Sequence, residues 1–515
     1  MTECTQSCFP FAPHFSRDVV ARFDGGQITT EAGALLLRPV EQRTGILRQF
    51  AACFLDLRRA DLVEHRVSEL VRQRVYGIAL GYEDLNDHDQ LRQDPLLALL
   101  SGKRDVEGAH RRRKQDRGKA GAGKSTLNRL ELTPADAKAD ARYKKIVMDE
   151  AAVDGLLVDL YIQAQSRQPE RIVLDLDATD DPVHGEQEGR FFHGYYGCYC
   201  YLPLYIFIDE HLVCARLRPS NIDASAGSLE EVERIVKRLR FTWPDAKIIL
   251  RADSGFCRDT LMSWCEKNRV GYVFGLAKNE RLVKKLRQPM KEAQGQWKQT
   301  GKPARRFRDF RYRTRESWKR GRRVVGKAEY LDKGENPRFV VTSIGTAEME
   351  ARSLYEDFYC ARGEMENRIK EQQLGLFADR TSTSWLHSNQ IRLYLSSIAY
   401  SLLAALRRLA LVGTDMAQAQ CGTIRLRLLK IGAQVRITAR KIWISMAAGH
   451  PAAAVFAAAH QKLMGVMPSG ALPGSLHAVG HPVRPTTNPK TNFDLQLNCE
   501  TSFGEKSGLK SRGEF

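Results

Sequence analysis

Several common motifs and segments are missing from this 515-residue chain. Its eleven cysteines include no C-x-x-C pair, which argues against a zinc ribbon and a thioredoxin-like redox site. No uncharged apolar run reaches 18 residues; the nearest, 393–406, carries serines and predicts a buried helix, so no membrane partner is expected. No signal peptide precedes Phe15. These absences favour a cytoplasmic protein in a reducing compartment.

Acidic residues are outnumbered by basic ones. Asp and Glu total 61 against 80 Lys and Arg, which gives a formal net charge of +19. An excess of this size favours a polyanionic partner, with nucleic acid as the leading candidate. A ribosomal-type or membrane-surface protein is the alternative that charge alone leaves open.

Most of the excess lies in residues 281–327, which hold 18 Lys and Arg against three acids. Within this segment RRFRDFRYRTRESW alternates basic and other residues at period two, with aromatics interleaved. The alternation predicts a solvated β-hairpin with a basic face. A charge run is often only a solvated surface, but basic and aromatic residues at this density indicate contacts to a nucleic-acid backbone and stacking on bases.

Periodicity and composition divide the chain into six predicted regions. Helical spacing dominates from Thr29 to Leu100, strands and helices alternate from Arg171 onward, and Gly, Pro, Asn and Ser accumulate after Pro468. An Arg-alternating strand pair is expected at 424–431 and 435–442. The regions are a mostly helical N-terminal DNA-binding region (1–165), an α/β core (166–280), a basic β-rich insertion domain (281–336), the second part of the core (337–412), a basic C-terminal region (413–467) and a disordered tail (468–515).

A phosphate-loop motif is present without its usual context. Residues 118–125 fit G-x-x-x-x-G-K-[ST], but the motif needs a hydrophobic strand before it, and HRRRKQDR stands there instead. We therefore favour a flexible basic segment that leads into a helix capped near Ser125. An ATPase remains the alternative, and its nucleotide hydrolysis would depend on Lys124.

Acids cluster where a strand is predicted. The stretch RIVLDLDATDD at 171–181 is apolar enough for a buried strand, and alternation places Asp175 and Asp177 on one face of it. A buried carboxylate is costly unless it is paired or binds a metal. A second apolar strand ends in Asp253, and a predicted helix carries Glu366.

Three such carboxylates suit phosphodiester chemistry. Two Mg²⁺ ions clamp the attacking and leaving oxygens of an in-line displacement, and Mg²⁺ prefers carboxylates while keeping water and phosphate in its shell. On the predicted helix Glu366 shares a stripe with Tyr359, Arg362 and Lys370. A salt-bridged, solvent-facing stripe is the alternative explanation for that pattern.

Three blocks of the sequence resemble those of insertion-sequence DDE transposases. They are DLDATDD, LRADSGF and the helix signature Y-x2-R-x3-E, and the similarity continues through HGEQEG, SWKRGRRVVGKAEY and YCARGEMENRIKE. Over about residues 10–465 the chain resembles the bacterial insertion-sequence family numbered thirteen-eighty, related to transposases with a β-strand insertion domain. Asp253 follows Asp177 by 76 residues and Glu366 follows Asp253 by 113, and the second gap has room for such a domain.

The resemblance implies an α/β fold, with an RNase H-like core interrupted by a β-rich insertion domain and an all-α N-terminal region. It implies a cut-and-paste transposase that works on double-stranded DNA, both terminal inverted repeats and target, as a homodimer. Two Mg²⁺ ions, or Mn²⁺ in their place, are the implied cofactors. The implied location is the bacterial cytoplasm, in association with the nucleoid.

The resemblance also assigns residues. The implied catalytic and metal-binding residues are Asp177, Asp253 and Glu366, and the implied DNA-binding residues are Tyr359, Arg362, Lys370, Trp318, Arg322 and Arg323. Related families place a Lys seven residues after the Glu, where this chain has Gln373, so Lys370 is expected to substitute. Trp318 resembles an insertion-domain Trp that stacks on a flipped base; a strand-surface aromatic packed in a small domain is the alternative. Asp175 is the second choice for the first acid, and Asp180 and Asp181 are expected in a turn.

Two other functions stay open at this stage. A two-metal nuclease or repair-type phosphodiesterase would keep the fold without mobility, and transfer of a 3′-hydroxyl end into target DNA separates it from a transposase. A DNA-binding protein with a dead catalytic site is the third hypothesis. The intact set of Asp177, Asp253 and Glu366 argues against it.

Overall fold

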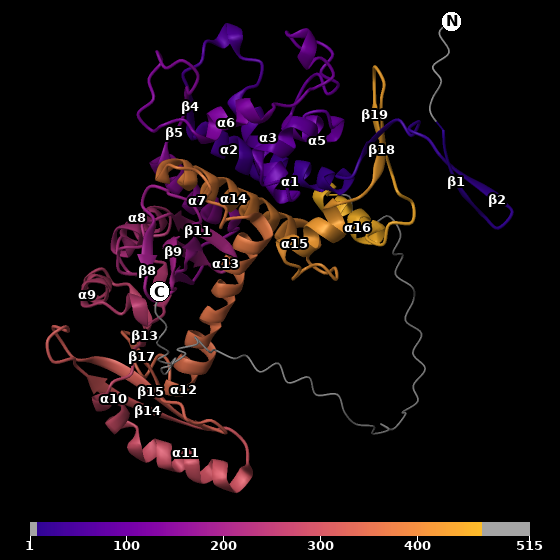
Figure 1. Cartoon of the computed structure of the whole chain (residues 1–515). Coiled ribbons are helices and arrows are strands. Elements are labelled where there is room, and N and C mark those ends of the chain that lie inside the picture. Colours follow the sequence, from indigo (N-terminus) through magenta and orange to yellow (C-terminus); the bar gives the residue numbers. More distant parts are fainter. Residues whose placement is uncertain (1–7, 466–515) are drawn as a thin grey trace, which may run out of the picture.

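A nine-stranded mixed sheet forms the centre of the structure, a computed structural model that describes residues 8–465 (Figure 1). The strand order is β11-β10-β6-β12-β13-β17-β15-β14, with β16 paired to β15. Strands β6, β12 and β13 run parallel, and the other pairs are antiparallel. The strands are β6 (Arg171–Ala178), β10 (Leu204–Ile208), β11 (His211–Arg216), β12 (Lys247–Ala252), β13 (Gly271–Leu276), β14 (Ala304–Tyr312), β15 (Arg322–Leu331), β16 (Gly334–Glu335) and β17 (Arg338–Thr342).

Strand β6 has one apolar face and one face that carries the acids. Ile172, Leu174 and Leu176 are buried in a core shared with three helices. These helices are α7 (Glu150–Ala164), α8 (Ser228–Thr242) and α9 (Asp259–Lys267). Because side chains alternate along a strand, Asp175 and Asp177 face the opposite side of the sheet.

An interrupted helix covers part of that opposite side. Leu354, Tyr355 and Phe358 pack against the sheet residues Ile249 and Val273. The sequence predicts one helix over 348–378, but the segment consists of α12 (Ala351–Ser353), a π-helical turn η6 (Leu354–Tyr359), a 3₁₀ turn η7 (Cys360–Arg362) and α13 (Gly363–Leu376). Single π turns inside helices are frequent at functional sites.

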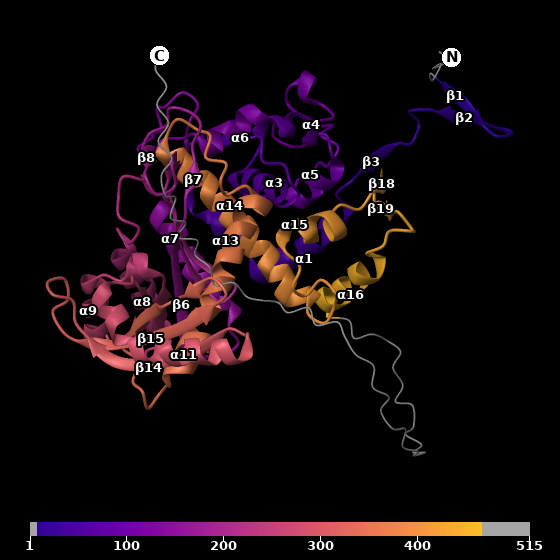
Figure 2. The same cartoon turned by 60° about the horizontal axis from the view of Figure 1, so that its bottom comes forward.

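The segment 281–336 differs from the separate β-rich domain that the sequence predicts. It begins with two helices, α10 (Glu280–Lys285) and α11 (Arg287–Thr300). The basic hairpin is present as β14 and β15, but β15 also pairs with β17, so the hairpin extends the central sheet. Val324, Val325 and Ala328 are fully buried, which explains why β15 joins the core instead of standing in solvent. Figure 2 shows α11 lying along β14 and β15.

The N-terminal region is mostly helical, but the prediction of an all-α region is wrong. Five short strands occur in it, and their pairing is invisible to local periodicity because β3 pairs with β18 and β4 with β5 across long sequence gaps. The strands are β1 (Phe9–His14), β2 (Arg17–Ala21), β3 (Gln27–Thr29), β4 (Phe54–Asp56) and β5 (Ile146–Met148). The main helices are α1 (Leu37–Thr44), α2 (Ile46–Ala52), α3 (Val67–Ala79), α4 (His88–Leu91), α5 (Pro95–Ser101) and α6 (Lys124–Glu131), with 3₁₀ turns η1 (Ala32–Leu36), η2 (Ala60–Leu62), η3 (Leu85–Asp87) and η4 (Lys114–Asp116).

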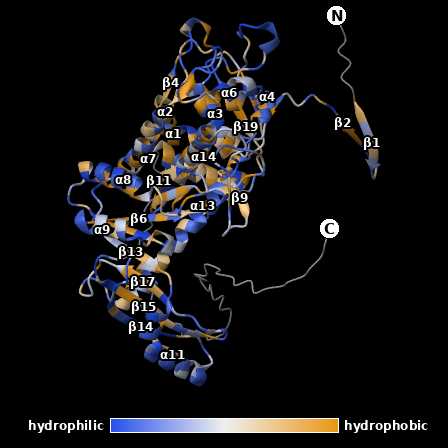
Figure 3. Cartoon of the chain, turned by 60° about the vertical axis from the view of Figure 1, so that its left-hand side comes forward, coloured by the Kyte–Doolittle hydropathy of each residue, from blue (hydrophilic) through white to orange (hydrophobic). Residues whose placement is uncertain are grey.

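Helix α14 (Leu386–Leu406) joins the N-terminal helices to the core. Its residues share one large apolar cluster with α1, α2, α3 and strands β10 and β11. The hydropathy view in Figure 3 shows this interior as apolar, whereas α11 at the far end of the molecule is mostly polar. No helix within residues 8–465 has both the length and the apolar character needed to cross a membrane.

In the C-terminal region the prediction of one strand is wrong. Residues 424–431 are expected to be extended, but the chain is helical there because Ile424, Leu428 and Leu429 are buried at helical spacing. The hairpin forms a few residues later. The elements are η8 (Arg407–Leu411), α15 (Cys421–Ile424), η9 (Arg425–Leu429), β18 (Ala433–Ile437), β19 (Ile442–Met446) and α16 (Ala453–Met464). The predicted disordered tail, 468–515, lies outside the described residues.

The phosphate-loop motif is not a nucleotide site. No strand stands directly before α6; the 3₁₀ turn η4 and an irregular loop lead into it. The loop's backbone N–H groups are used inside the protein: that of Ala122 donates to Gln73 (2.8 Å) and that of Lys124 to Asp89 (3.1 Å). The Lys124 ammonium donates to Asn86 (3.0 Å). A phosphate would therefore meet donors that are already engaged.

Candidate active site

The first two predicted acids lie at neighbouring strand ends. Asp177 is the next-to-last residue of β6, and Asp253 directly follows β12. The two strands are parallel and in register, with Ala252 opposite Leu176, so the next residues along the two strands are Asp253 and Asp177. The sheet therefore brings together two carboxylates that are 76 residues apart in sequence.

Arg362 connects the strand acids to the helix acid. Its guanidinium lies 3.4 Å from the Asp177 carboxylate and 2.7 Å from the Glu366 carboxylate. The Arg362 side chain is only 6% exposed and that of Asp177 15%, whereas Glu366 at 39% is open to solvent. One buried cation thus holds the end of β6 and the first turns of α13 together.

The electrostatics of Asp177 indicate that Asp253 and Glu366 lie near it. Burial raises the pKa of Asp177, and the charges of Asp253 and Glu366 raise it further, while Arg362 lowers it; the net value is about 7 against an ordinary 3.8. A carboxyl group with this pKa is partly protonated at neutral pH. A cation placed beside such a group stabilises its charged form.

Tyr359 reaches the same place from the π turn. A methyl group added at Gly275 would lie 2.6 Å from the Tyr359 hydroxyl and 2.9 Å from the backbone nitrogen of Ser254. The absence of a side chain at Gly275 therefore lets the tyrosine approach the corner where Asp253 sits. Asp253 itself is fixed there, because its Oδ1 accepts a hydrogen bond from the backbone N–H of Gly255 (2.9 Å).

Asp175 belongs to a structural pair. Arg251, directly opposite on β12, donates to both of its oxygens, at 2.5 and 2.7 Å, and also to the Phe358 carbonyl. Asp175 is 6% exposed. Its role is thus to tie β6 and β12 to the π turn that carries Tyr359, beneath the site.

Residues after the strand end differ from the expected turn. Asp181 is part of a small strand, β7 (Asp181–Pro182), and is 1% exposed. Burial raises its pKa to about 8, and Thr381 donates to it (2.9 Å). On α13 the predicted Lys370 is exposed one turn beyond Glu366, and Gln373 donates to the carbonyl of Asp180 (3.1 Å).

The donor set fits a metal that binds through few protein ligands. Within residues 8–465, His, Cys, Asp and Glu side chains form no ready-made group of three or more around one metal position. Asp177 and Glu366 instead share Arg362. Mg²⁺ commonly takes one or two carboxylates and completes its shell with water and substrate phosphate, so these residues fit Mg²⁺ better than a metal that needs an all-protein cage.

Trp318 does not fit the predicted base-stacking role. It is 3% exposed, and its ring packs edge-to-face on Tyr312 (5.8 Å between centroids) and under the Arg322 guanidinium (5.4 Å). Its backbone N–H donates to Thr314 (2.7 Å) and its carbonyl accepts from Arg313 (3.2 Å). A ring held in the core in this way has no face for a base.

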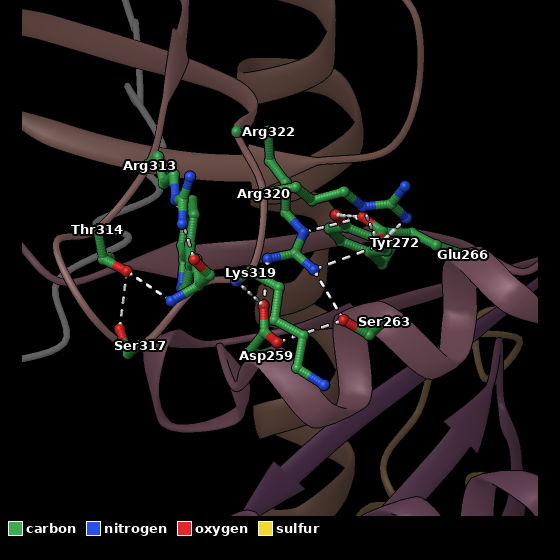
Figure 4. A network of polar contacts seen from close by, with 12 residues as sticks. Asp259, Ser263, Glu266, Tyr272, Arg313, Thr314, Ser317, Lys319, Arg320 and Arg322 are labelled. Atoms are coloured by element: carbon green, nitrogen blue, oxygen red, sulfur yellow. Dashed lines mark hydrogen bonds and ion pairs between the residues drawn. The ribbon is translucent and has the colours of Figure 1, made fainter.

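Arg322 and Arg323 do not fit the predicted DNA-binding role either. Arg322 is 4% exposed and pairs with Glu266 (2.8 Å) and Asp259 (2.6 Å) of α9, as Figure 4 shows. Arg323 pairs with Asp309 (2.5 Å) and donates to the Ile344 carbonyl (2.9 Å). Both arginines fasten the hairpin to the core, because β15 is an inner strand and its charges must be paired.

Exposed basic side chains lie on the other strand of the hairpin, β14, at Arg305, Arg306 and Arg308, and also on the preceding helix. Arg287, Lys291 and Lys298 of α11 are exposed, and their spacing places them on one stripe. Met290 and Ala293 are buried, on another side of the same helix. We call Arg287, Lys291 and Lys298 the α11 basic stripe. In the sequence this stripe is visible as a four- and seven-residue spacing of basic residues, which is typical of one face of a helix.

Comparison with known proteins identifies a family. Residues 11–468 match the family model described as "Transposase DDE domain group 1". Among solved structures, a cryo-EM structure of the piggyBac transposase synaptic complex with hairpin DNA is similar, with a TM-score of 0.37 and 10% identity over 78% of this chain and 79% of that one. No curated protein matches the sequence. Since the family model spans most of its length, the chain belongs to the group 1 family of DDE transposase domains.

Proposed function

We propose that this transposase belongs to a bacterial insertion sequence and moves it by cutting and pasting DNA. The observation that carries the proposal is the meeting of Asp177, Asp253 and Glu366 around Arg362 at the ends of β6 and β12. Asp177, Asp253 and Glu366 are the proposed catalytic and metal-binding residues. Two Mg²⁺ ions, for which Mn²⁺ can substitute, are the proposed cofactors.

The strand arrangement supports an RNase H-like core. Counted from β6, the first five strands of the sheet lie in the order 3-2-1-4-5, with the second antiparallel to the first and the fourth and fifth parallel to it. The segment from α10 to β15 is then an insertion between the fifth strand and the helix that carries Glu366. Its strands continue the core sheet, and its helix α11 carries the basic stripe.

Each residue has a distinct task in the proposed reaction. When bound, the metal ions supply an activated water or 3′-hydroxyl nucleophile and stabilise the leaving oxygen. Asp177 and Asp253, fixed at strand ends, set the position of this chemistry on the sheet. Arg362 keeps Glu366 near Asp177 and offers a guanidinium to a phosphate that enters the site. Tyr359 and the exposed Lys370 contact the strand on either side of that phosphate.

DNA is the proposed partner, as terminal inverted repeats and as target. The net charge of +19 and the α11 basic stripe support phosphate contacts. The N-terminal helical region is proposed to bind the repeats, and a homodimer is proposed because two element ends must be cut and joined together. The proposed location is the bacterial cytoplasm, at the nucleoid.

Cleavage and joining of DNA test this proposal. The full chain is incubated with a plasmid that carries its gene and the flanking DNA, with and without Mg²⁺, and with a labelled target plasmid. Wild type should give metal-dependent cuts at the element ends and a covalent joint between a 3′ end and the target. Asp177→Asn, Asp253→Asn and Glu366→Gln should each lower both products by more than about a hundredfold.

Glu364→Gln is the matched control. Glu364 is on the same helix, is 76% exposed and pairs only with Arg368 among the described residues. Its activity should equal that of wild type. Cleavage that persists in Asp177→Asn contradicts the assignment of the site, and cutting without any joined product indicates a nuclease instead of a transposase.

A further inference from the structure

An aromatic hairpin stands beside the three acids, and no function has yet been given to it. Six of the eleven residues from 191 to 201 are aromatic, against 8% of the whole chain. They form β8 (Phe191–His193) and β9 (Cys198–Tyr201), which pair with each other, and β9 also pairs with β7. The sequence predicts one strand from 195 to 208, but β9 and β10 belong to different sheets because the chain bends at Leu202–Pro203.

The base of this hairpin is fixed to the protein. The HGEQEG segment before it bonds to the loop before α14: the N–H of Glu188 donates to the Ser384 carbonyl (3.0 Å), and the side chain of Gln187 donates to the Thr381 carbonyl (2.8 Å). Tyr201, fully buried, donates its hydroxyl to the carbonyl of Glu188 (2.7 Å). The hairpin is therefore held at a set position relative to the end of β6.

The tip of the hairpin is open. Phe192 is 58% exposed, Tyr195 64% and Tyr199 49%. A methyl group added at Gly194 or Gly197 would meet no atom of the described residues within 4 Å. Exposing large rings in this number costs free energy in water, and a monomer gains nothing from it.

The rings of the hairpin meet one another edge to face. Phe192 meets Tyr199 edge-to-face (5.6 Å), and Tyr195 meets Tyr196 edge-to-face (4.9 Å). In an edge-to-face pair at least one ring keeps a face open for a further stacking partner. The guanidinium of Arg190 lies 4.8 Å from the Tyr199 ring, so a positive charge accompanies the aromatics.

The place of the hairpin indicates what it binds. Strand β7 starts four residues after Asp177 and pairs with β9, so the aromatics lie just beyond the end of β6. Burial raises the pKa of Tyr196, and the charges of Asp180, Asp177 and Asp253 raise it further because they lie near its ring. Bases are uncharged and stack on any aromatic face, so these rings suit the bases that flank a phosphate held at the acids.

We propose that Phe192 and Tyr195 stack on unpaired bases of the DNA strand next to the phosphate that is cut, and so hold the end of the duplex open. This inference rests on the proposed function, whose site it deepens. Trp318 is buried and cannot stack on a base, and the proposal assigns this stacking to exposed residues instead.

Binding to a forked duplex tests the inference without any cleavage. The probe is a short duplex with non-complementary arms and a 2-aminopurine at the first unpaired position, mixed with the full chain in the absence of divalent metal. Wild type should quench the 2-aminopurine. The double variant Phe192→Ala/Tyr195→Ala should lose the quenching and bind the fork about tenfold more weakly. Its affinity for the fully paired duplex should not change.

Two controls make the result specific. Phe241→Ala removes a ring that is 81% exposed on α8 and should bind both probes like wild type. Tyr195→Phe keeps the ring and should keep the quenching, and Tyr195→Ala alone replaces the double variant if that variant does not fold. Equal loss on fork and paired duplex, or no loss on either, overturns the inference. So does a double variant that binds the fork normally but no longer self-associates, because the rings would then meet a second copy.

The two proposals fail in different ways. A wild-type chain that binds neither probe contradicts the proposed function itself. Normal DNA binding and cleavage, with no difference between fork and duplex in the double variant, contradicts only the role of the hairpin.

Discussion

At the scale of single residues, the main feature of the site is that the surroundings of Asp177 disfavour its negative charge. Three acids and one arginine leave an excess of negative charge in a place where Asp177 is nearly buried. A protein that needed only stability would not keep such a carboxyl group, because a buried charge without full pairing is costly. The unfavourable arrangement is therefore best explained by a cation that arrives with the substrate.

Replacing Asp177 should reveal the cost of burying its charge, because the free energy of unfolding of the wild type then depends on pH in a way that the variant's does not. The folded pKa of Asp177, about 7, exceeds its ordinary value of 3.8, so its contribution to the free energy of unfolding is lost as pH rises from about 4 to about 7. Asp177→Asn does not titrate. It should therefore equal wild type near pH 4 and exceed it above pH 7, by at most about 4 kcal/mol. Thermal unfolding across this pH range measures the difference.

Metal binding gives the same experiment a second readout. At pH 8, Mg²⁺ at about a hundred times its Kd should stabilise wild type by about 2.7 kcal/mol and leave Asp177→Asn unchanged. Glu364→Gln should respond like wild type. A variant that is stabilised by Mg²⁺ as much as wild type would show that the metal binds elsewhere.

The sequence predicts best those residues whose side-chain chemistry is unusual for the element that carries them. Acids at the ends of apolar strands are unusual enough to mark Asp177 and Asp253, and the structure places them side by side. Trp318 and Arg322 show the opposite case, because an Arg or Trp between other charged residues looks exposed in sequence. Arg322 is buried because β15 is paired on both of its edges, and Trp318 is buried because its ring packs against Tyr312 and Arg322.

At the scale of elements, a buried ionic cluster joins three helices. Glu131 at the end of α6 is fully buried and pairs with Arg74 of α3 and with Arg392 of α14 (3.0 Å). Burial raises the pKa of Glu131, and the two arginines more than offset this, so its pKa lies below the ordinary value. The cluster connects the N-terminal helices to the helix that packs on the catalytic sheet.

Removing the shared acid should destabilise the fold strongly. Glu131→Gln leaves the buried Arg74 guanidinium and the partly buried Arg392 guanidinium without their counter-charge, which costs about 3–5 kcal/mol of the free energy of unfolding at pH 7. Because the folded pKa of Glu131 is depressed, its contribution is present above the ordinary value of 4.5 and is lost as pH falls below it. Urea unfolding at pH 7 and at low pH measures both effects. Asp415→Asn, in an ion pair that is 59% exposed, should change nothing measurable.

Elements with strong local patterns were predictable and those that depend on distant pairing were not. Apolar spacing predicts helices over 224–241 and 259–268 and a strand over 271–276, and α8, α9 and β13 lie there. The π turn η6 and the strands β3 and β4 carry no local signal, because the first depends on packing against the sheet and the others on partners far along the chain. The alternating arginines after Ile424 form a helix, since burial of the intervening leucines decides the conformation.

At the scale of the whole molecule, the three acids and many of the exposed basic side chains lie in different places. The acids sit at the ends of the inner strands β6 and β12, whereas many exposed basic side chains lie on α11 and β14, at the end of the molecule remote from the N-terminal helices (Figure 1). DNA that reaches the acids therefore needs attraction from elsewhere. Neutralising phosphates releases counterions, so such attraction appears as a dependence of affinity on salt.

Neutralising the α11 basic stripe should reduce that dependence. Arg287→Gln/Lys291→Gln removes two exposed charges from one helical stripe, and each lost phosphate contact lowers the slope of log K against log salt by about one unit. The slope for duplex DNA should fall by about two, and the loss of affinity should be nearly independent of sequence. Lys237→Gln/Lys267→Gln removes the same charge from exposed positions on α8 and α9 and should leave the slope as it is. An equal fall in both pairs would mean that net charge, and not this helix, attracts the DNA.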